Sequence, residues 1–134
     1  MAKRVLSVGQ CVPDGAAIKS FLAQRFAATV QSSDSADDAL AMLHNGTFDL
    51  VLVNRVFDAD GASGLDFIKS VKAIPQTGKI PIMLVSNFAD AQQKAVDLGA
   101  APGFGKAQLG SQQLADLLTP ILAAGDDEPD ASQA

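Results

Sequence analysis

Several residue types are missing or rare in this chain, and each absence excludes a class of site. The 134 residues include no Trp or Tyr, one Cys and one His. The lone cysteine, Cys11, cannot form an internal disulfide and favours a reducing compartment, so we expect a cytoplasmic protein. The lone histidine, His44, excludes any site that needs two histidines. Without Trp or Tyr, a stacking platform for single-stranded nucleic acid would consist of Phe alone.

Long apolar runs and basic patches are also missing. No apolar run approaches the ~18–20 residues that span a bilayer, and Gly9-Gln10 interrupts the first run too early for a signal peptide. The net charge is −5, but four of the 15 acids lie in the last nine residues. The rest of the chain is close to neutral. We therefore expect neither a nucleic-acid partner nor a membrane partner.

The length and composition predict one globular domain. Hydrophobic residues make up 48% and charged residues 19% of the chain, which is typical of a folded domain with a core. We expect this domain to cover residues 1–124. Residues 125–134 are rich in acids and poor in large apolar side chains, so we expect a disordered tail there.

Short apolar runs alternate with segments of helical periodicity along the whole domain. The runs predict strands at residues 4–8, 28–32, 48–53, 80–85 and 101–105. Between them, apolar residues recur at the i, i+3, i+4 spacing of amphipathic helices. The predicted helices begin near Asp14, at one of residues 33–35, and near Ser63, Phe88 and Ser111. Pro120 falls inside the last of these and should kink or shorten its final turn.

Strands that alternate with helices of this length imply right-handed crossovers onto a parallel sheet. Five such units fit an open, doubly wound α/β fold. Ligands of this fold class bind outside the carboxyl ends of the strands. The residues at those ends are Gly9, Gln10, Asn54, Ser86, Asn87 and Lys106.

These residues, and the segments that lead to them, resemble the receiver domain of two-component response regulators. The resemblance covers residues 3 to about 124 and rests on the order and spacing of segments 4–8, 48–54, 64–65, 80–86 and 99–100, followed by Lys106. It implies a flavodoxin-like fold, with a five-stranded parallel sheet in the order 2-1-3-4-5 and five flanking helices.

The resemblance also implies that the phosphorylation site is degenerate. Receivers usually carry an acidic pair that holds Mg²⁺, a phosphoacceptor aspartate, a Ser or Thr, and a Lys. The matched positions here are Gly9 and Gln10, Asn54, Ser86 and Lys106. A carboxamide is a poor nucleophile, and the first two residues offer no carboxylate to a hard ion such as Mg²⁺. We therefore expect no catalytic residue, metal or cofactor.

Partners of receivers usually bind the face formed by the fourth helix, the fifth strand and the fifth helix. The matched residues are mostly glutamines with little charge: Gln92, Gln93, Asp97, Gly103, Phe104, Gln108, Gln112 and Gln113. The position of the usual switch aromatic falls on Gly103, with Phe104 predicted to face the other way. This face could dock a signalling protein, form a homodimer, or be ordinary solvated surface.

Lys106 has no charged neighbour at the matched positions, so it must pair with another acid, lower its pKa or reach solvent. A hydrogen bond to Asn54 or an extended side chain in water is the interpretation we favour.

Three functions remain open. The first is a non-enzymatic, phosphorylation-independent module that acts through protein contacts. The second is a residual switch that binds a small anion at Ser86, Asn87 and Lys106. The third is phosphotransfer through a displaced acceptor in the lengthened loop after the third strand, at Asp58 or Asp60.

Overall fold

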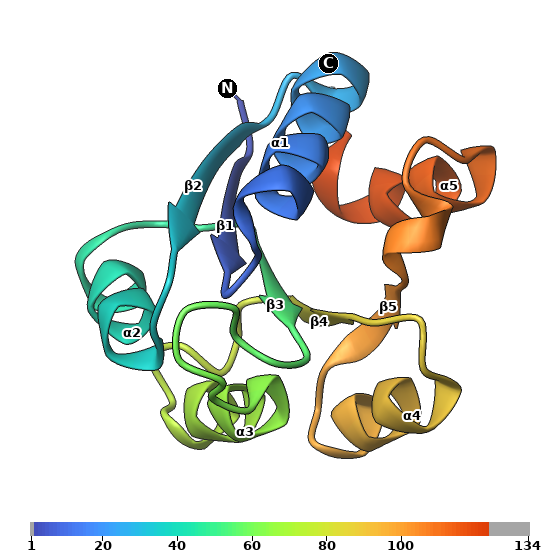
Figure 1. Cartoon of the computed structure of the whole chain (residues 1–134). Helices are drawn as coiled ribbons and strands as arrows, with labels where there is room; N and C mark the ends of the chain where they lie inside the picture. The colour runs from blue at the N-terminus through green and yellow to red at the C-terminus, as the bar shows by residue number, and fades with distance from the viewer. Residues whose placement is uncertain (1, 124–134) are drawn as a thin grey trace.

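A computed structural model describes residues 2–123 (Figure 1). One sheet contains every strand of this region, in the order β2-β1-β3-β4-β5, and all neighbouring pairs are parallel. The strands are β1 (Arg4–Val8), β2 (Thr29–Ser33), β3 (Leu50–Asn54), β4 (Ile82–Val85) and β5 (Ala101–Phe104). The predicted fold class and strand order are confirmed. The predicted tail at residues 125–134 lies outside the described residues.

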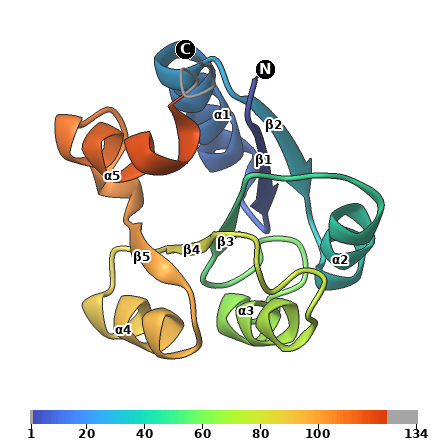
Figure 2. The same ribbon diagram turned by 180° about the vertical axis from the view of Figure 1, so that it is seen from behind.

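Within the described part of the chain, five helices cover the two faces of the sheet. They are α1 (Val12–Phe26), α2 (Ala36–Asn45), α3 (Gly64–Ala73), α4 (Ala89–Asp97) and α5 (Gln112–Leu122), and a 3₁₀ turn, η1 (Lys106–Gln108), precedes α5. Helices α1 and α5 lie on one face, whereas α2, α3 and α4 lie on the other (Figures 1 and 2). No helix in residues 2–123 is long and apolar enough to cross a membrane.

The core consists of two apolar layers, one on each side of the sheet. Side chains alternate along a strand, so Val5 of β1 packs under α1 and α5, whereas Leu6 packs under the other three helices. Leu52 and Val53 of β3 divide in the same way. This double burial explains why the strands are continuous apolar runs rather than alternating ones.

Some boundaries differ from the predicted ones. Strand β4 begins at Ile82 because Pro81, just before it, has no backbone N–H to donate. Phe48 lies before β3 and packs under the Arg4 guanidinium, 4.7 Å from the ring centroid. Helix α5 continues two residues past Pro120, so the proline does not end the helix. It sits in the last turn, where the missing N–H frees only the carbonyl of the exposed Asp116.

Candidate functional site at the carboxyl edge of the sheet

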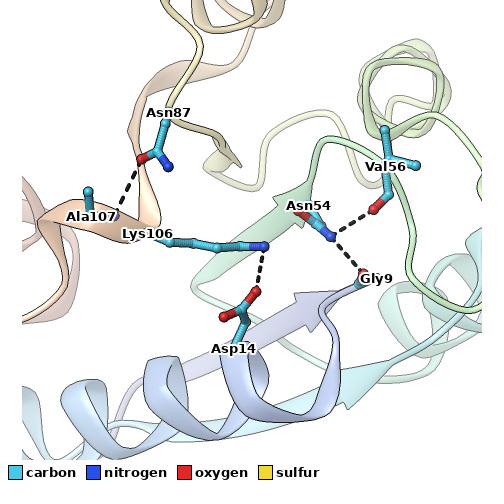
Figure 3. Close-up of polar contacts among 7 residues, drawn as sticks. All are labelled: Gly9, Asp14, Asn54, Val56, Asn87, Lys106 and Ala107. Atoms are coloured by element: carbon cyan, nitrogen blue, oxygen red, sulfur yellow. Dashed lines mark hydrogen bonds and ion pairs between the residues drawn. The ribbon is translucent and has the colours of Figure 1, made fainter.

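Asn54 ends β3, and backbone carbonyls hold its side chain. Its Nδ2 donates to the carbonyl oxygen of Gly9 at 3.0 Å and to that of Val56 at 2.7 Å (Figure 3). Both partners can only accept, so the nitrogen of the carboxamide must face them. The side chain therefore ties the end of β1 to the loop after β3. A carboxylate in the same place would face two carbonyl oxygens.

Gly9 is closed in by a buried aromatic ring. It follows β1 with φ +77°, a conformation that favours glycine, and a Cβ added there would collide with the Phe57 ring. Phe57 is 1% exposed and packs edge-on against Phe67, with 6.0 Å between the ring centroids. No side chain fits at residue 9 unless this ring moves.

The acids of the lengthened loop are exposed. Asp58 donates its backbone N–H to the Gly9 carbonyl at 3.0 Å, and Asp60 accepts from the Ala62 N–H at 3.0 Å. An isolated antiparallel bridge between Val56 and Ser63 closes the loop. The loop thereby delivers Phe57 to the core and leaves both carboxylates in solvent.

Lys106 follows β5 and pairs with Asp14 in the first turn of α1. The distance from Nζ to Oδ2 is 2.7 Å, and both side chains are about one-third exposed, at 31% and 34% (Figure 3). The hydrogen bond from Lys106 holds the pKa of Asp14 below its ordinary value, and a hydrogen bond from Cys11 adds to this, while burial opposes it.

Lys106 therefore pairs with an acid, the first of the alternatives that the sequence leaves open, and its side chain stays partly exposed. Of the two arrangements favoured from the sequence, the hydrogen bond to Asn54 is wrong. Sequence reasoning missed Asp14 as the partner. Asp14 lies in the first turn of the helix that follows β1, and acids are favoured there by the helix dipole. The fold brings that turn to the carboxyl edge of the sheet. An acid in the first turn of the helix after β1 was therefore the sequence feature that could have predicted a partner for Lys106.

Ser86 and Asn87 follow β4 and hold backbone groups in place. Ser86 Oγ accepts from the Phe88 N–H at 3.1 Å, just before α4, and the residue is 9% exposed. Asn87 Oδ1 accepts from the Ala107 N–H at 3.3 Å (Figure 3). The loops after β4 and β5 are thus joined through a side chain.

A cavity of about 270 Å³ lies between these loops. Its lining residues are Asn54, Arg55, Val56, Val85, Ser86, Asn87, Phe88 and Lys106. The structure thus brings the matched positions at 54, 86 and 106 together. Gln10 does not line this cavity and lies against a different one, beside α1. The Arg55 guanidinium stacks on the exposed Phe88 ring, 4.8 Å from its centroid.

Two residues of the expected interaction face point inward: Gln92, which corrects the sequence-based interpretation, and Phe104, as its place in the strand predicts. Gln92 is half-buried, and its Nε2 donates to the carbonyls of Leu84 at 2.9 Å and Ser86 at 3.0 Å. Its Oε1 accepts from the Gly103 N–H at 3.2 Å, so Gln92 joins β4 to β5. Phe104 is 2% exposed and packs in the layer beneath α1 and α5.

Of the other residues of that face, four are exposed, as a docking surface requires, and two are not. Gln93, Asp97, Gln112 and Gln113 are exposed. Gln108 is half-buried, because its Oε1 accepts from the buried Gly105 N–H at 2.9 Å. Gly103 has no room for a side chain, since an added Cβ would collide with the Leu84 carbonyl oxygen.

Comparisons with known proteins agree on the fold. No family model matches the sequence. The chain is 26% identical over 117 residues to the gliding motility regulatory protein of Myxococcus xanthus, which is 86% of this chain but only 15% of that protein.

Two solved structures are similar over nearly their whole length. A putative response regulator from Chloroflexus aurantiacus has a TM-score of 0.80 and 19% identity, over 91% of this chain and 98% of that one. The signal receiver domain of a DNA-binding response regulator from Colwellia psychrerythraea has a TM-score of 0.75 and 23% identity, over 89% and 97%. The chain has the fold of response-regulator receiver domains.

Proposed function

We propose that this chain is a receiver-type signalling module that acts through protein contacts and is not phosphorylated at residue 54. The pair of hydrogen bonds from Asn54 Nδ2 to the carbonyls of Gly9 and Val56 carries the proposal. The nitrogen lone pair of an amide is delocalised and its oxygen is a poor nucleophile. An acyl phosphate, which forms on a carboxylate, has no acceptor in this side chain.

The side chains at this edge do not fit Mg²⁺, which needs carboxylate and water oxygens in an octahedral array. Gly9 has no side chain, Gln10 lines another cavity, and Asn54 directs its nitrogen at carbonyl oxygens. Within residues 2–123, no three His, Cys, Asp or Glu side chains are grouped so that they could hold a metal. Metal-assisted phosphoryl transfer therefore has no support at this site.

The position that usually reports phosphorylation also lacks its side chain. Gly103 stands at the switch position, and the nearby Phe104 is part of the core on the opposite face. The Ser86 hydroxyl already accepts a hydrogen bond at the start of α4. We infer that partner binding, rather than an aromatic side chain that moves inward, selects the active state.

A signalling protein is the partner that we propose, and the surface of α4, β5 and α5 is its docking face. Gln93 and Asp97 are exposed there, beside a hollow of about 440 Å³ whose lining includes Val96 and Pro102. A weakly charged surface of this kind suits a protein, or a second copy of this chain. The similarity to a motility regulator supports a signalling role.

The test is an amide NMR titration of the full chain with Mg²⁺, followed by Mg²⁺ with beryllium fluoride, a mimic of a phosphoryl group. We expect the amide resonances of four residues to keep their chemical shifts: Gly9, Asn54, Ser86 and Lys106. Saturable shifts at these four amides would contradict the proposal. A receiver with an intact aspartate, titrated in the same buffer, verifies that the mimic is active.

Anion binding is a second candidate, because one observation favours it. The cavity beside Asn54 is lined by Arg55 and Lys106 and, among the described residues, by no acid, although Asp14 pairs with Lys106 from outside the lining. Titration with inorganic phosphate alone would shift Ser86 and Lys106 if an anion binds there. Phosphotransfer through the exposed Asp58 or Asp60 would instead leave phosphate on one of them after incubation with acetyl phosphate, which mass spectrometry detects.

A further inference from the structure

A second cavity, away from Asn54 and Lys106, contains buried polar atoms without partners. Within residues 2–123, three buried side-chain polar atoms make no hydrogen bond: Ser7 Oγ, Gln10 Nε2 and Gln10 Oε1. Both residues line one cavity of about 270 Å³. Buried polar groups are nearly always hydrogen-bonded, because an unpaired one loses water and gains nothing. Their concentration at one place points to a bound molecule, either ordered water or a ligand.

The strands supply the polar floor of this cavity. Ser7 is 1% exposed, and it interrupts a strand whose neighbouring residues Leu6 and Val8 are fully buried. Its register partner on β2 is Ser32, which also lines the cavity. Side chains at paired positions of parallel strands point to the same face, so two hydroxyls lie together here.

Helix α1 supplies the facing wall. Its lining residues are Val12, Gly15, Ala16 and Lys19, whose spacing is that of one helix face. Gly15 and Ala16 are small, which leaves the volume open. Cys11 at the N-cap makes no side-chain capping bond. The amide end of a 15-residue helix, with its partial positive charge, therefore adjoins the unpaired groups of Ser7 and Gln10.

Among the described residues that line the cavity, one side chain is positively charged and one is negatively charged. Lys19 comes from α1 and Asp34 from the segment after β2. Both residues are exposed, and neither forms an ion pair within the described part of the chain. A ligand with a single net charge would satisfy only one of them, whereas a zwitterion would satisfy both.

We propose that this cavity binds a small zwitterion of the α-amino acid class. The ligand carboxylate faces Lys19 and the start of α1, and its ammonium group faces Asp34. A polar side chain of the ligand hydrogen-bonds to Ser7 and Gln10, whose hydroxyl and carboxamide can each donate and accept. The volume is below the roughly 300–1,000 Å³ of sites for drug-sized ligands, which restricts the ligand to a small molecule.

The site is independent of the cavity beside Asn54, because the two share no lining residue. They are nevertheless joined through one helical turn. Gly15 lines the new site, and the preceding residue, Asp14, pairs with Lys106. A ligand that orders this turn would therefore also change the environment of Lys106, through its ion pair with Asp14.

The experiment is an amide NMR titration of the full chain with each common L-amino acid in turn. We expect polar amino acids to give saturable shifts at Ser7, Gln10 and Ser32. Lys19→Ala should weaken binding by about two- to fivefold, the equivalent of one lost ion pair between exposed groups. The control is Lys69→Ala, which removes an exposed helical lysine outside the cavity and should leave the affinity unchanged.

Ser7→Ala separates binding from folding. Because it removes an unpaired buried hydroxyl, the ligand-free variant should melt at the wild-type temperature or above. Its amino acid response should be lost. The proposal is overturned if no amino acid gives saturable shifts, if the shifts survive both Lys19→Ala and Ser7→Ala, or if they occur only around Asn54.

Discussion

Asn54→Asp would place a carboxylate, the group on which acyl phosphates form, at the end of β3, and we expect it to destabilise the fold. The change exchanges one NH₂ group for an oxygen of nearly equal size. Two hydrogen bonds are lost, at 3.0 and 2.7 Å, and the new carboxylate faces the oxygens of Gly9 and Val56. An ordinary hydrogen bond contributes about 0.5–1.5 kcal/mol net to stability. The Gly9 carbonyl keeps its bond from Asp58 and Val56 is exposed, so we expect the two lost bonds to cost about 1–2 kcal/mol in total.

The assay is urea unfolding at pH 7, without and with Mg²⁺. The matched control is Asn87→Asp, the same chemical change at the same edge of the sheet. Asn87 uses its oxygen as an acceptor and is exposed, so the control should stay within about 0.5 kcal/mol of wild type. Added Mg²⁺ should not rescue Asn54→Asp, because residues 9 and 10 contribute no carboxylate. An Asn54→Asp protein as stable as wild type, or one rescued by Mg²⁺, would refute the reasoning.

Three further predictions concern the surroundings of Asn54. Gly9→Asp should cost about 1–3 kcal/mol in urea unfolding, because the new Cβ displaces a buried ring. The pKa of Asp14 is lowered in the folded state, so its pair with Lys106 stabilises above the ordinary carboxyl pKa. That stability is lost as the pH falls through the folded value. The stability difference between wild type and Lys106→Met should thus vanish in acid and stay below about 1 kcal/mol at pH 7, since the pair is partly exposed. Gln92→Ala should cost about 2 kcal/mol because it unpairs strand carbonyls, whereas Gln93→Ala should change little.

The fold could be predicted from the sequence because its signals are local and repeated. Buried parallel strands appear as short, continuous apolar runs, and the helices between them show one apolar stripe each. Ser35, Ser63 and Ser111 mark helix starts, and each accepts a hydrogen bond from the N–H three residues on. The predicted starts of β3 and β4 are two residues too early, because apolar residues, Phe48 and Ile80, precede the first residue of each strand.

The partners within the site could not be predicted in the same way. Asp14 and Lys106 are far apart in the sequence, and only the assembled sheet, whose carboxyl edge gathers the segments after β1 and β5, brings α1 beside the loop after β5. From the sequence, Gln92 is indistinguishable from a surface glutamine. Nothing in the helical pattern indicates that its side chain hydrogen-bonds to backbone carbonyls at the end of β4. Likewise, Phe57 lies in a loop that reads as polar, yet it fills the space at Gly9.

The residues around Asn54 depend on one another. The carboxamide of Asn54 supplies the donor that the Gly9 and Val56 carbonyls require. Phe57 occupies the volume in which a side chain at residue 9 would lie, and Asp14 balances the charge of Lys106. Each arrangement is satisfied without a cation. An acid introduced at residue 9 alone would collide with the buried Phe57 ring. An acid introduced at residue 54 alone would face two carbonyl oxygens and no metal ligand. Phosphoryl chemistry on an aspartate at residue 54 would therefore require acids at both positions together with a change in the loop that carries Phe57.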